Sequence, residues 1–303
     1  MRLPDSILLG SCGLVLLCAC SAAGDDSGFE PSSSGSGATG SGASGSSTGG
    51  QLNIGGMGSG GGAGGDCSEE AKRIYLVSVE HGLYSFDPNV PGLGAYNLVG
   101  TLTCPSASDP QSMAVDRGGT AWVFYSDGQL FQVSTLDASC APTSYQHPVQ
   151  QAFNQLGMGF TATVPDSTDE VLYVISPDFG LSTIDIGTMA VTQTNALVMA
   201  AELTGGIDAK LFMFAADTAG LSEIDLANLS QAPIHTFSEL SGTTAWAFAR
   251  YAGQFYMFTS PGTPTTTTVY DPKTDSSMVR DQSIGFTVVG AGQSTCVPPP
   301  PPE

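Results

Sequence analysis

The feature that most constrains this chain is a unit of two short apolar runs that recurs five times after residue 70. A Gly-containing turn separates the two runs, and the second run ends on Asp or Ser. The second runs are 83–87, 130–134, 181–185, 221–225 and 267–271. The first runs begin at Ile74, Trp122, Val171, Leu211 and Phe255, so successive units start 40 to 49 residues apart. Repeats of this length built from short strands predict the blades of a β-propeller.

Each blade is expected to contain two further strands, one beside the central axis and one at the outer edge. Runs rich in small residues, which suit strands crowded around an axis, are 112–116, 157–161, 201–205 and 245–249. Polar and β-branched runs, which suit an outer edge, are 95–101, 142–146, 190–195, 233–237 and 277–281. Residues 67–296 are therefore expected to form one all-β domain, a five-bladed β-propeller.

The two ends of this domain are expected to complete the same blade. Residues 67–73 are short and polar and supply no axial strand for the first blade, whereas a spare apolar run, 285–290, occurs near the C-terminal end. We expect this run to become the missing strand and to close the ring. Cys67 and Cys296 would then meet on one face. A disulfide between them would stabilise the domain by roughly 5 kcal/mol on the chain-entropy model.

The folded part contains an even number of cysteines, namely Cys67, Cys104, Cys140 and Cys296. In an oxidising compartment this indicates two disulfides. Elimination pairs Cys104 with Cys140 on neighbouring outer strands, although these two are expected near opposite faces of the ring. No CxxC or Cys/His spacing indicates a zinc site.

The first segment of the chain, 1–19, has the features of a signal peptide. Its apolar run of about 11 residues is too short to span a bilayer. The run ends in Leu-Cys-Ala-Cys at 17–20, which resembles the lipobox of bacterial lipoproteins. The resemblance implies that Cys20 receives diacylglycerol and anchors the protein, and that Ser21 directs it to the outer membrane. An ordinary secretion signal without lipidation is the alternative.

Segments on both sides of the domain lack the composition of a packed core. Residues 20–66 are almost entirely Gly, Ser, Ala and Thr, so we expect a disordered tether. A flexible chain of this kind reaches roughly 35–40 Å. Residues 297–303 form a short Pro-rich tail.

The chain is strongly acidic, with 28 Asp and Glu against 8 Lys and Arg and a formal net charge of −20. Such a field repels nucleic acid and anionic lipid, so we expect no nucleic-acid partner. The excess charge either keeps the protein soluble or gives it affinity for cations and basic partners.

Four of the five units place an acid before the Gly of the turn, at Glu80, Asp127, Asp178 and Asp217. Glu202, at the start of an axial run, is expected to look onto the same mouth of the ring. These acids either bind Ca²⁺, which takes six to eight oxygens, or a cationic ligand, or they serve the turns themselves. Turn chemistry is the favoured interpretation, because no DxDxDG loop is present.

The second runs end on Asp87, Asp185, Asp225 and Asp271, with Ser134 in their place in one unit. Asp and Ser both bond the backbone two residues on, so this exchange favours a turn over catalysis.

A hydrolytic interpretation has little support. Glu202 and Asp116 are candidates for the acid and base of a polysaccharide hydrolase, but no motif pairs them. No G-x-S-x-G elbow occurs, and the three histidines have no paired spacing. No catalytic residue is assigned.

In its period and in strands such as 83–87, the folded part resembles β-propellers of the Kelch, WD40 and quinoprotein kinds. It lacks the GH…WD signature and the tryptophan docking pattern. The full layout resembles uncharacterised predicted lipoproteins of Gram-negative bacteria. The segments that carry this likeness are 112–116, 157–160, 201–205, 245–248 and 290–296.

That resemblance implies a cell-envelope lipoprotein but no particular activity. We therefore expect a non-enzymatic binding or scaffold propeller, held at the membrane through its lipid anchor and facing a protein or polysaccharide partner. A polysaccharide-directed hydrolase is the alternative. No cofactor is expected, apart from the weaker Ca²⁺ interpretation of the acidic mouth.

Overall fold

The computed structural model describes residues 67–151, 153–215, 217–262 and 264–299. The predicted signal peptide, Cys20 and the tether lie outside this part of the chain, as does the end of the Pro-rich tail. Within the described residues, no helix is long and apolar enough to cross a membrane.

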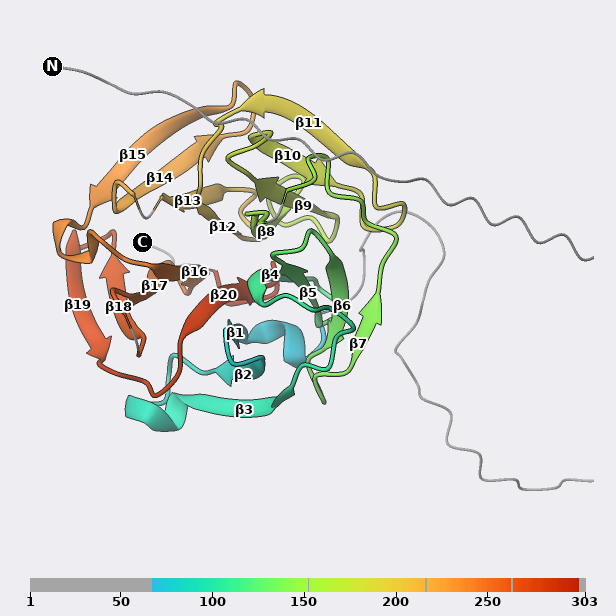
Figure 1. The fold of residues 1–303 in the computed structure, drawn as a ribbon. Coiled ribbons are helices and arrows are strands. Elements are labelled where there is room, and N and C mark those ends of the chain that lie inside the picture. The colour runs from blue at the N-terminus through green and yellow to red at the C-terminus, as the bar shows by residue number, and fades with distance from the viewer. Residues whose placement is uncertain (1–66, 152, 216, 263, 300–303) are drawn as a thin grey trace, which may run out of the picture. The chain divides into compact units, whose positions relative to one another are not determined.

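Five four-stranded antiparallel sheets are arranged as blades around an axis, so the fold is the predicted five-bladed β-propeller (Figure 1). From the axis outward, blade 1 contains β20 (Val288–Gln293), β1 (Ile74–Ser78), β2 (Gly82–Phe86) and β3 (Tyr96–Thr101). Blade 2 contains β4 (Pro110–Val115), β5 (Thr120–Tyr125), β6 (Leu130–Ser134) and β7 (Cys140–Pro142). Blade 3 contains β8 (Gly157–Ala162), β9 (Glu170–Ile175), β10 (Leu181–Ile184) and β11 (Val191–Ala196).

Blade 4 contains β12 (Glu202–Gly205), β13 (Leu211–Ala215), β14 (Gly220–Asp225) and β15 (Ser230–Thr236). Blade 5 contains β16 (Ala245–Tyr251), β17 (Gln254–Ser260), β18 (Thr266–Asp271) and β19 (Ser276–Asp281). Short 3₁₀ helices precede β1, β3 and β16, and they are η1 (Glu70–Lys72), η2 (Gly92–Ala95) and η3 (Ser238–Leu240).

The two ends of the domain complete one blade, as the sequence predicts. β20 pairs with β1 in antiparallel register, with Gln293 opposite Ile74. β20 begins later than the predicted run 285–290. The reason is that the backbone of Ile284 and Phe286 hydrogen-bonds to Thr265, at 3.0 and 3.1 Å, before the chain reaches β1.

The innermost strand of each blade contacts its two neighbours around the axis (Figure 1). Glycine makes this contact possible, because the backbones approach too closely for a side chain. A Cβ atom at Gly157 would lie 1.9 Å from the carbonyl oxygen of Ala201, and one at Gly205 would lie 2.3 Å from that of Phe160. The small-residue runs of the sequence therefore mark strands whose backbones, rather than side chains, fill the centre.

Burial decreases from the axis to the outer edge of each blade. Every residue of β1 and of β13 is buried, since both faces of these inner strands pack on neighbouring blades. Most residues of the outer strands β11 and β15 are exposed. This gradient explains why the inner runs are continuously apolar and the outer runs polar.

The outer strand of blade 2 lies at a different position from the one predicted. The sequence places it at 142–146, whereas β7 ends at Pro142. The side chain of Thr143 bonds the carbonyl of Leu130 at 2.7 Å, and the chain then leaves the sheet. Residues 143–156 form the connection to blade 3 instead.

Both expected cysteine pairs lie at disulfide distance. Cys67 and Cys296 have Cα atoms 5.6 Å apart and join the two ends of the domain. Cys104 and Cys140 have Cα atoms 5.1 Å apart.

Cys104 follows the end of β3 and Cys140 begins β7 next to the opposite turn, as expected, and the two still meet because the end of β3 leans onto the neighbouring blade. A Cβ atom at Gly100 would lie 3.0 Å from the Cβ of Ala138 and from the carbonyl oxygen of Asp137, in the turn before β7.

Candidate functional site

The ring has two faces that differ in their connections. We call upper the face formed by the turns between the second and third strands of each blade and by the loops that link successive blades. We call lower the face formed by the remaining turns and by the two ends of the domain. The upper segments are 79–81, 102–109, 126–129, 143–156, 176–180, 197–201, 216–219, 237–244, 261–265 and 282–287.

The four acids of the upper turns all accept hydrogen bonds, either from a neighbouring loop or from their own turn. Asp127 accepts hydrogen bonds from Ser106 Oγ at 2.8 Å and Gln129 Nε2 at 2.7 Å. Asp178 accepts one from Gln151 Nε2 at 2.6 Å.

The other two acids have backbone partners. Asp217 accepts the Thr218 N–H at 2.7 Å, and Glu80 accepts the Thr287 N–H with both oxygens at 3.4 Å. In the described residues, no three His, Cys, Asp or Glu side chains gather so as to hold a metal ion. The predicted acids thus share a face without forming one cation cage.

Glu202 does not look onto the upper face as expected. Its side chain is buried, with 1% exposed, at the upper end of β12. Ser112 Oγ of β4 donates a hydrogen bond to Glu202 Oε2 at 2.8 Å. Burial raises the pKa of Glu202 well above its ordinary value. Glu202 joins blades 2 and 4 across the axis rather than offering a charge to a ligand.

Asp116 lies at the other end of the axis from Glu202. It follows the last residue of β4, four residues beyond Ser112, which corresponds to roughly 13 Å along a strand. Asp116 Oδ2 accepts the indole N–H of Trp122 at 2.9 Å. The two carboxyls of a glycoside hydrolase lie about 5 to 9.5 Å apart. Asp116 and Glu202 are therefore not arranged as the predicted acid and base.

A polar cluster on the lower face was missed by sequence reasoning. Glu170 Oε1 accepts the Arg117 N–H at 2.7 Å, and Glu170 Oε2 accepts the Thr295 hydroxyl at 2.9 Å. Arg117 Nη2 reaches Cys67 Sγ at 3.2 Å. Burial raises the pKa of Glu170 to about 7, and the nearby Asp116 adds to the shift. No motif marks this cluster, because its members come from four distant parts of the chain.

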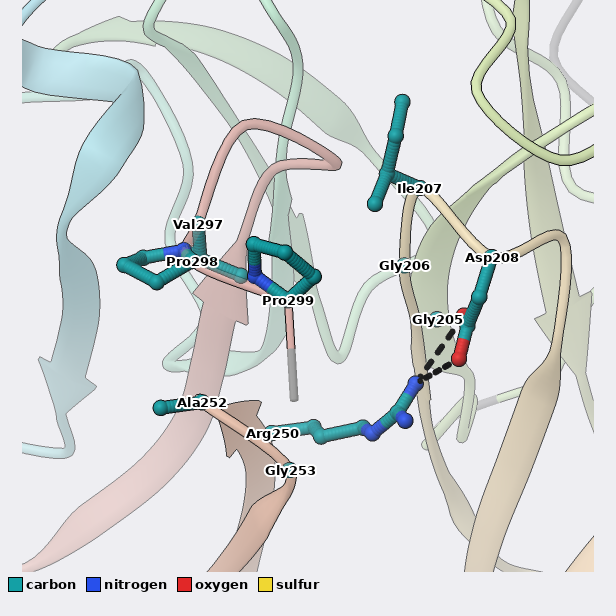
Figure 2. Close-up of a pocket in the computed structure, with 10 residues that line it drawn as sticks. All are labelled: Gly205, Gly206, Ile207, Asp208, Arg250, Ala252, Gly253, Val297, Pro298 and Pro299. Carbon is teal, nitrogen blue, oxygen red and sulfur yellow. Dashed lines mark hydrogen bonds and ion pairs between the residues drawn. The ribbon is translucent and has the colours of Figure 1, made fainter. Parts of the chain in front are cut away.

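The lower face also contains a small hollow (Figure 2). Arg250 Nη1 contacts both carboxylate oxygens of Asp208, at 2.8 and 3.0 Å, and its guanidinium lies 4.7 Å from the ring centre of Phe212. Pro298 and Pro299 cover the opposite side. The volume of about 10 Å³ accommodates about one water molecule, which is too little for an organic ligand.

The residues that end each third strand are turn residues, as predicted. Their side chains accept the backbone N–H two residues on, at 2.9 Å for each Asp and 3.3 Å for the Ser. They are Asp87, Asp185, Asp225, Asp271 and Ser134.

Basic residues are distributed unequally between the two faces. The upper segments contain six acids and no Lys or Arg. These acids are Glu80, Asp109, Asp127, Asp178, Asp217 and Glu239. Every Lys and Arg after residue 66 lies in the lower segments or on a strand, at Lys72, Arg73, Arg117, Lys210, Arg250, Lys273 and Arg280. The upper face therefore carries negative charge without a basic residue to offset it.

No protein family matches this chain, and no curated protein does. Several solved structures resemble it at low identity. A chain in a nidogen/laminin complex is 7% identical with a TM-score of 0.48, covering 73% of this chain and 97% of the other. Virginiamycin B lyase from Staphylococcus aureus is 11% identical with a TM-score of 0.41, covering 71% of each chain.

A protein of unknown function from Bacteroides caccae is 10% identical with a TM-score of 0.42, covering 75% of this chain and 84% of that one. Similarity at this level does not extend to function.

Proposed function

We propose that this protein is a non-enzymatic binding propeller of the cell envelope, held to the membrane through a lipid on Cys20 and contacting its partner with the upper face. The observation that supports this most is the charge of that face, whose loops contain six acids and no basic residue. Such a surface steers and binds a partner of opposite charge.

The buried carboxyls support binding over catalysis. Glu202, Glu170 and Asp116 are the carboxyls with raised pKa values, and each is bonded inside the protein by groups from other strands or turns. The bonds of Glu202 and Glu170 link blades to one another, and that of Asp116 joins β4 to β5 within blade 2. The carboxyls thus have a structural task that explains their burial.

Site-specific photo-crosslinking in intact cells tests the binding role. A crosslinking amino acid replaces Asp217 on the upper face, or Asp271 in a lower turn as the matched control. We expect one discrete partner band from position 217 and none from position 271. Equal labelling from both positions, or no band from either, would contradict the proposal.

Metabolic labelling tests the anchor. A palmitate analogue should label the full-length protein, because the lipobox places a small residue before Cys20. Labelling should disappear in Cys20→Ala and the protein should leave the membrane fraction. An unlabelled wild-type protein, or equal labelling of the variant, would exclude lipidation at this residue.

A further inference from the structure

A buried tyrosine hydroxyl between the upper ends of blades 1 and 2 has no hydrogen-bond partner among the described residues. Tyr125 is the last residue of β5 and is fully buried, and its hydroxyl is one of few side-chain polar atoms left unsatisfied in this part of the chain. An unsatisfied buried hydroxyl costs about 1–3 kcal/mol. Because this hydroxyl lowers the stability of the fold and bonds nothing in the described residues, it is a candidate contact for a ligand.

Two upper-face acids belong to the segments next to that hydroxyl, since Asp127 lies two residues after Tyr125 and Asp109 bonds the intervening Ser126. The Ser126 N–H donates to the carbonyl of Asp109 at 3.1 Å, and Ser106 Oγ donates to Asp127 Oδ2 at 2.8 Å. These bonds hold the loop before β4 against the turn after β5. Burial raises the pKa of Tyr125 to about 12, and the charges of Asp127 and Asp109 add to this shift.

His81 covers this group of acceptors. Its Nε2 lies 3.2 Å from Asp109 Oδ1, and its ring centre lies 6.0 Å from that of Tyr125. Its side chain is 33% exposed and that of Asp109 is 68% exposed, so both can be reached from the upper face. Rotation of His81 away from Asp109 would release its contact with Asp109 Oδ1.

The chemistry of the three acceptors matches one kind of ligand. A primary ammonium has three N–H donors, and two carboxylates with a phenol oxygen supply three acceptors. A divalent cation such as Ca²⁺ takes six to eight oxygens, and no metal-holding group of three acids exists in the described residues. A guanidinium prefers a bidentate pair with one planar carboxylate.

We propose that Asp109, Asp127 and Tyr125 form an anchor for the ammonium group of a lysine side chain on a basic protein partner, with His81 as its movable cover. The anchor lies on the acidic upper face, whose field concentrates basic segments there. This inference rests on the proposed binding role of that face and identifies the residue type that the face selects.

The test measures the affinity of full-length protein in non-ionic detergent for octalysine, at one fixed salt concentration. Asp109→Asn and Asp127→Asn should each weaken binding about tenfold, the loss expected for a hydrogen bond to a charged group. Asp185→Asn and Asp271→Asn remove the same charge from lower turns and should change affinity less than twofold. His81→Ala should tighten binding, because it removes the cover.

Tyr125→Phe is the sharpest variant. Its hydroxyl has no partner in the described residues, so its removal should leave the melting temperature unchanged or higher while weakening octalysine binding about two- to tenfold. Octa-acetyl-lysine should not bind, and octa-arginine should bind without dependence on Tyr125.

If the variants at Asp109, Asp127 and Tyr125 bind octalysine as tightly as the wild type, the proposed anchor is wrong. That result leaves the photo-crosslinking from position 217 untouched, so it is distinguishable from failure of the proposed function. Stabilisation by Ca²⁺ that requires both Asp109 and Asp127 would also overturn it, in favour of a metal site.

Discussion

The upper and lower faces of this propeller use carboxylates in opposite ways. On the lower face, Glu170 and Asp116 are buried beside Arg117, and the turn acids bond their own backbone. On the upper face, Asp109 is 68% exposed and no Lys or Arg lies in any loop. The lower carboxylates therefore contribute to joining the chain, whereas Asp109 on the upper face stays exposed. Residue type alone does not distinguish the two roles.

The largest effect should come from opening the lower seam. Replacing Cys67 and Cys296 together by Ala should lower the free energy of unfolding by about 5 kcal/mol, since the bond closes a very long loop. The same change at Cys104 and Cys140, which close a shorter loop, should cost about 4 kcal/mol. Urea unfolding of both double variants measures the difference. If the Cys104/Cys140 variant loses more stability than the Cys67/Cys296 variant, the bond between the two ends of the domain is not the stronger constraint.

The second effect concerns Glu170, whose pKa burial raises from 4.5 to about 7. The folded state then holds a proton that the unfolded state releases. This contribution to stability is fully present below about pH 4.5 and is lost as the pH rises through about 7, with a size of about 3 kcal/mol. Glu170→Gln should reduce the fall in stability between pH 5 and pH 8.

Urea unfolding of wild type and Glu170→Gln at both pH values gives the comparison. The upper-face variant Asp217→Asn serves as control and should change stability by less than about 0.5 kcal/mol at pH 7. Parallel pH profiles for wild type and Glu170→Gln would show that the lower cluster does not bind this proton.

The smallest effect should come from a single lower turn. Asp271 accepts the Lys273 N–H at 2.9 Å, and Asp271→Ala should lower stability by about 1 kcal/mol. For a domain of this size that corresponds to about 2–4 °C in melting temperature. Glu80→Ala, whose backbone contact on the upper face is long at 3.4 Å, should shift the midpoint less. Equal shifts in melting temperature for the two variants would show that turn acids contribute equally to stability on both faces.

Much of the fold was predictable because each blade repeats one local pattern. Period-two apolar runs, turn glycines and small-residue axial runs are local signals, and they identified the five blades and the closure of blade 1 by β20. The outer strand β7 was misplaced: it ends at Pro142, and the next residue, Thr143, bonds the carbonyl of Leu130 through its side chain. That side-chain contact has no signature in a run of polar residues.

The candidate site was less predictable, because it depends on contacts between blades. The acid-before-Gly pattern identified Asp127 but not Asp109, which lies in a loop without a pattern. The position of Glu202 at the start of an axial run predicted that it faces the mouth, whereas Glu202 is buried and bonded to Ser112. The twist of the sheets decides which side of a turn contacts the next blade. A local sequence pattern carries no information about that twist.

Closure by β20 has a consequence for how the chain acquires its fold. The strand that completes blade 1 is the last to be synthesised, while its partner β1 is the first strand of the domain. Until β20 arrives, β1 presents an unpaired edge, which is an aggregation and proteolysis hazard. Pairing these distant ends is also slow, since it requires closure of the longest loop in the domain. Stop codons shortly before residue 288 should therefore yield degraded protein rather than a four-bladed remnant.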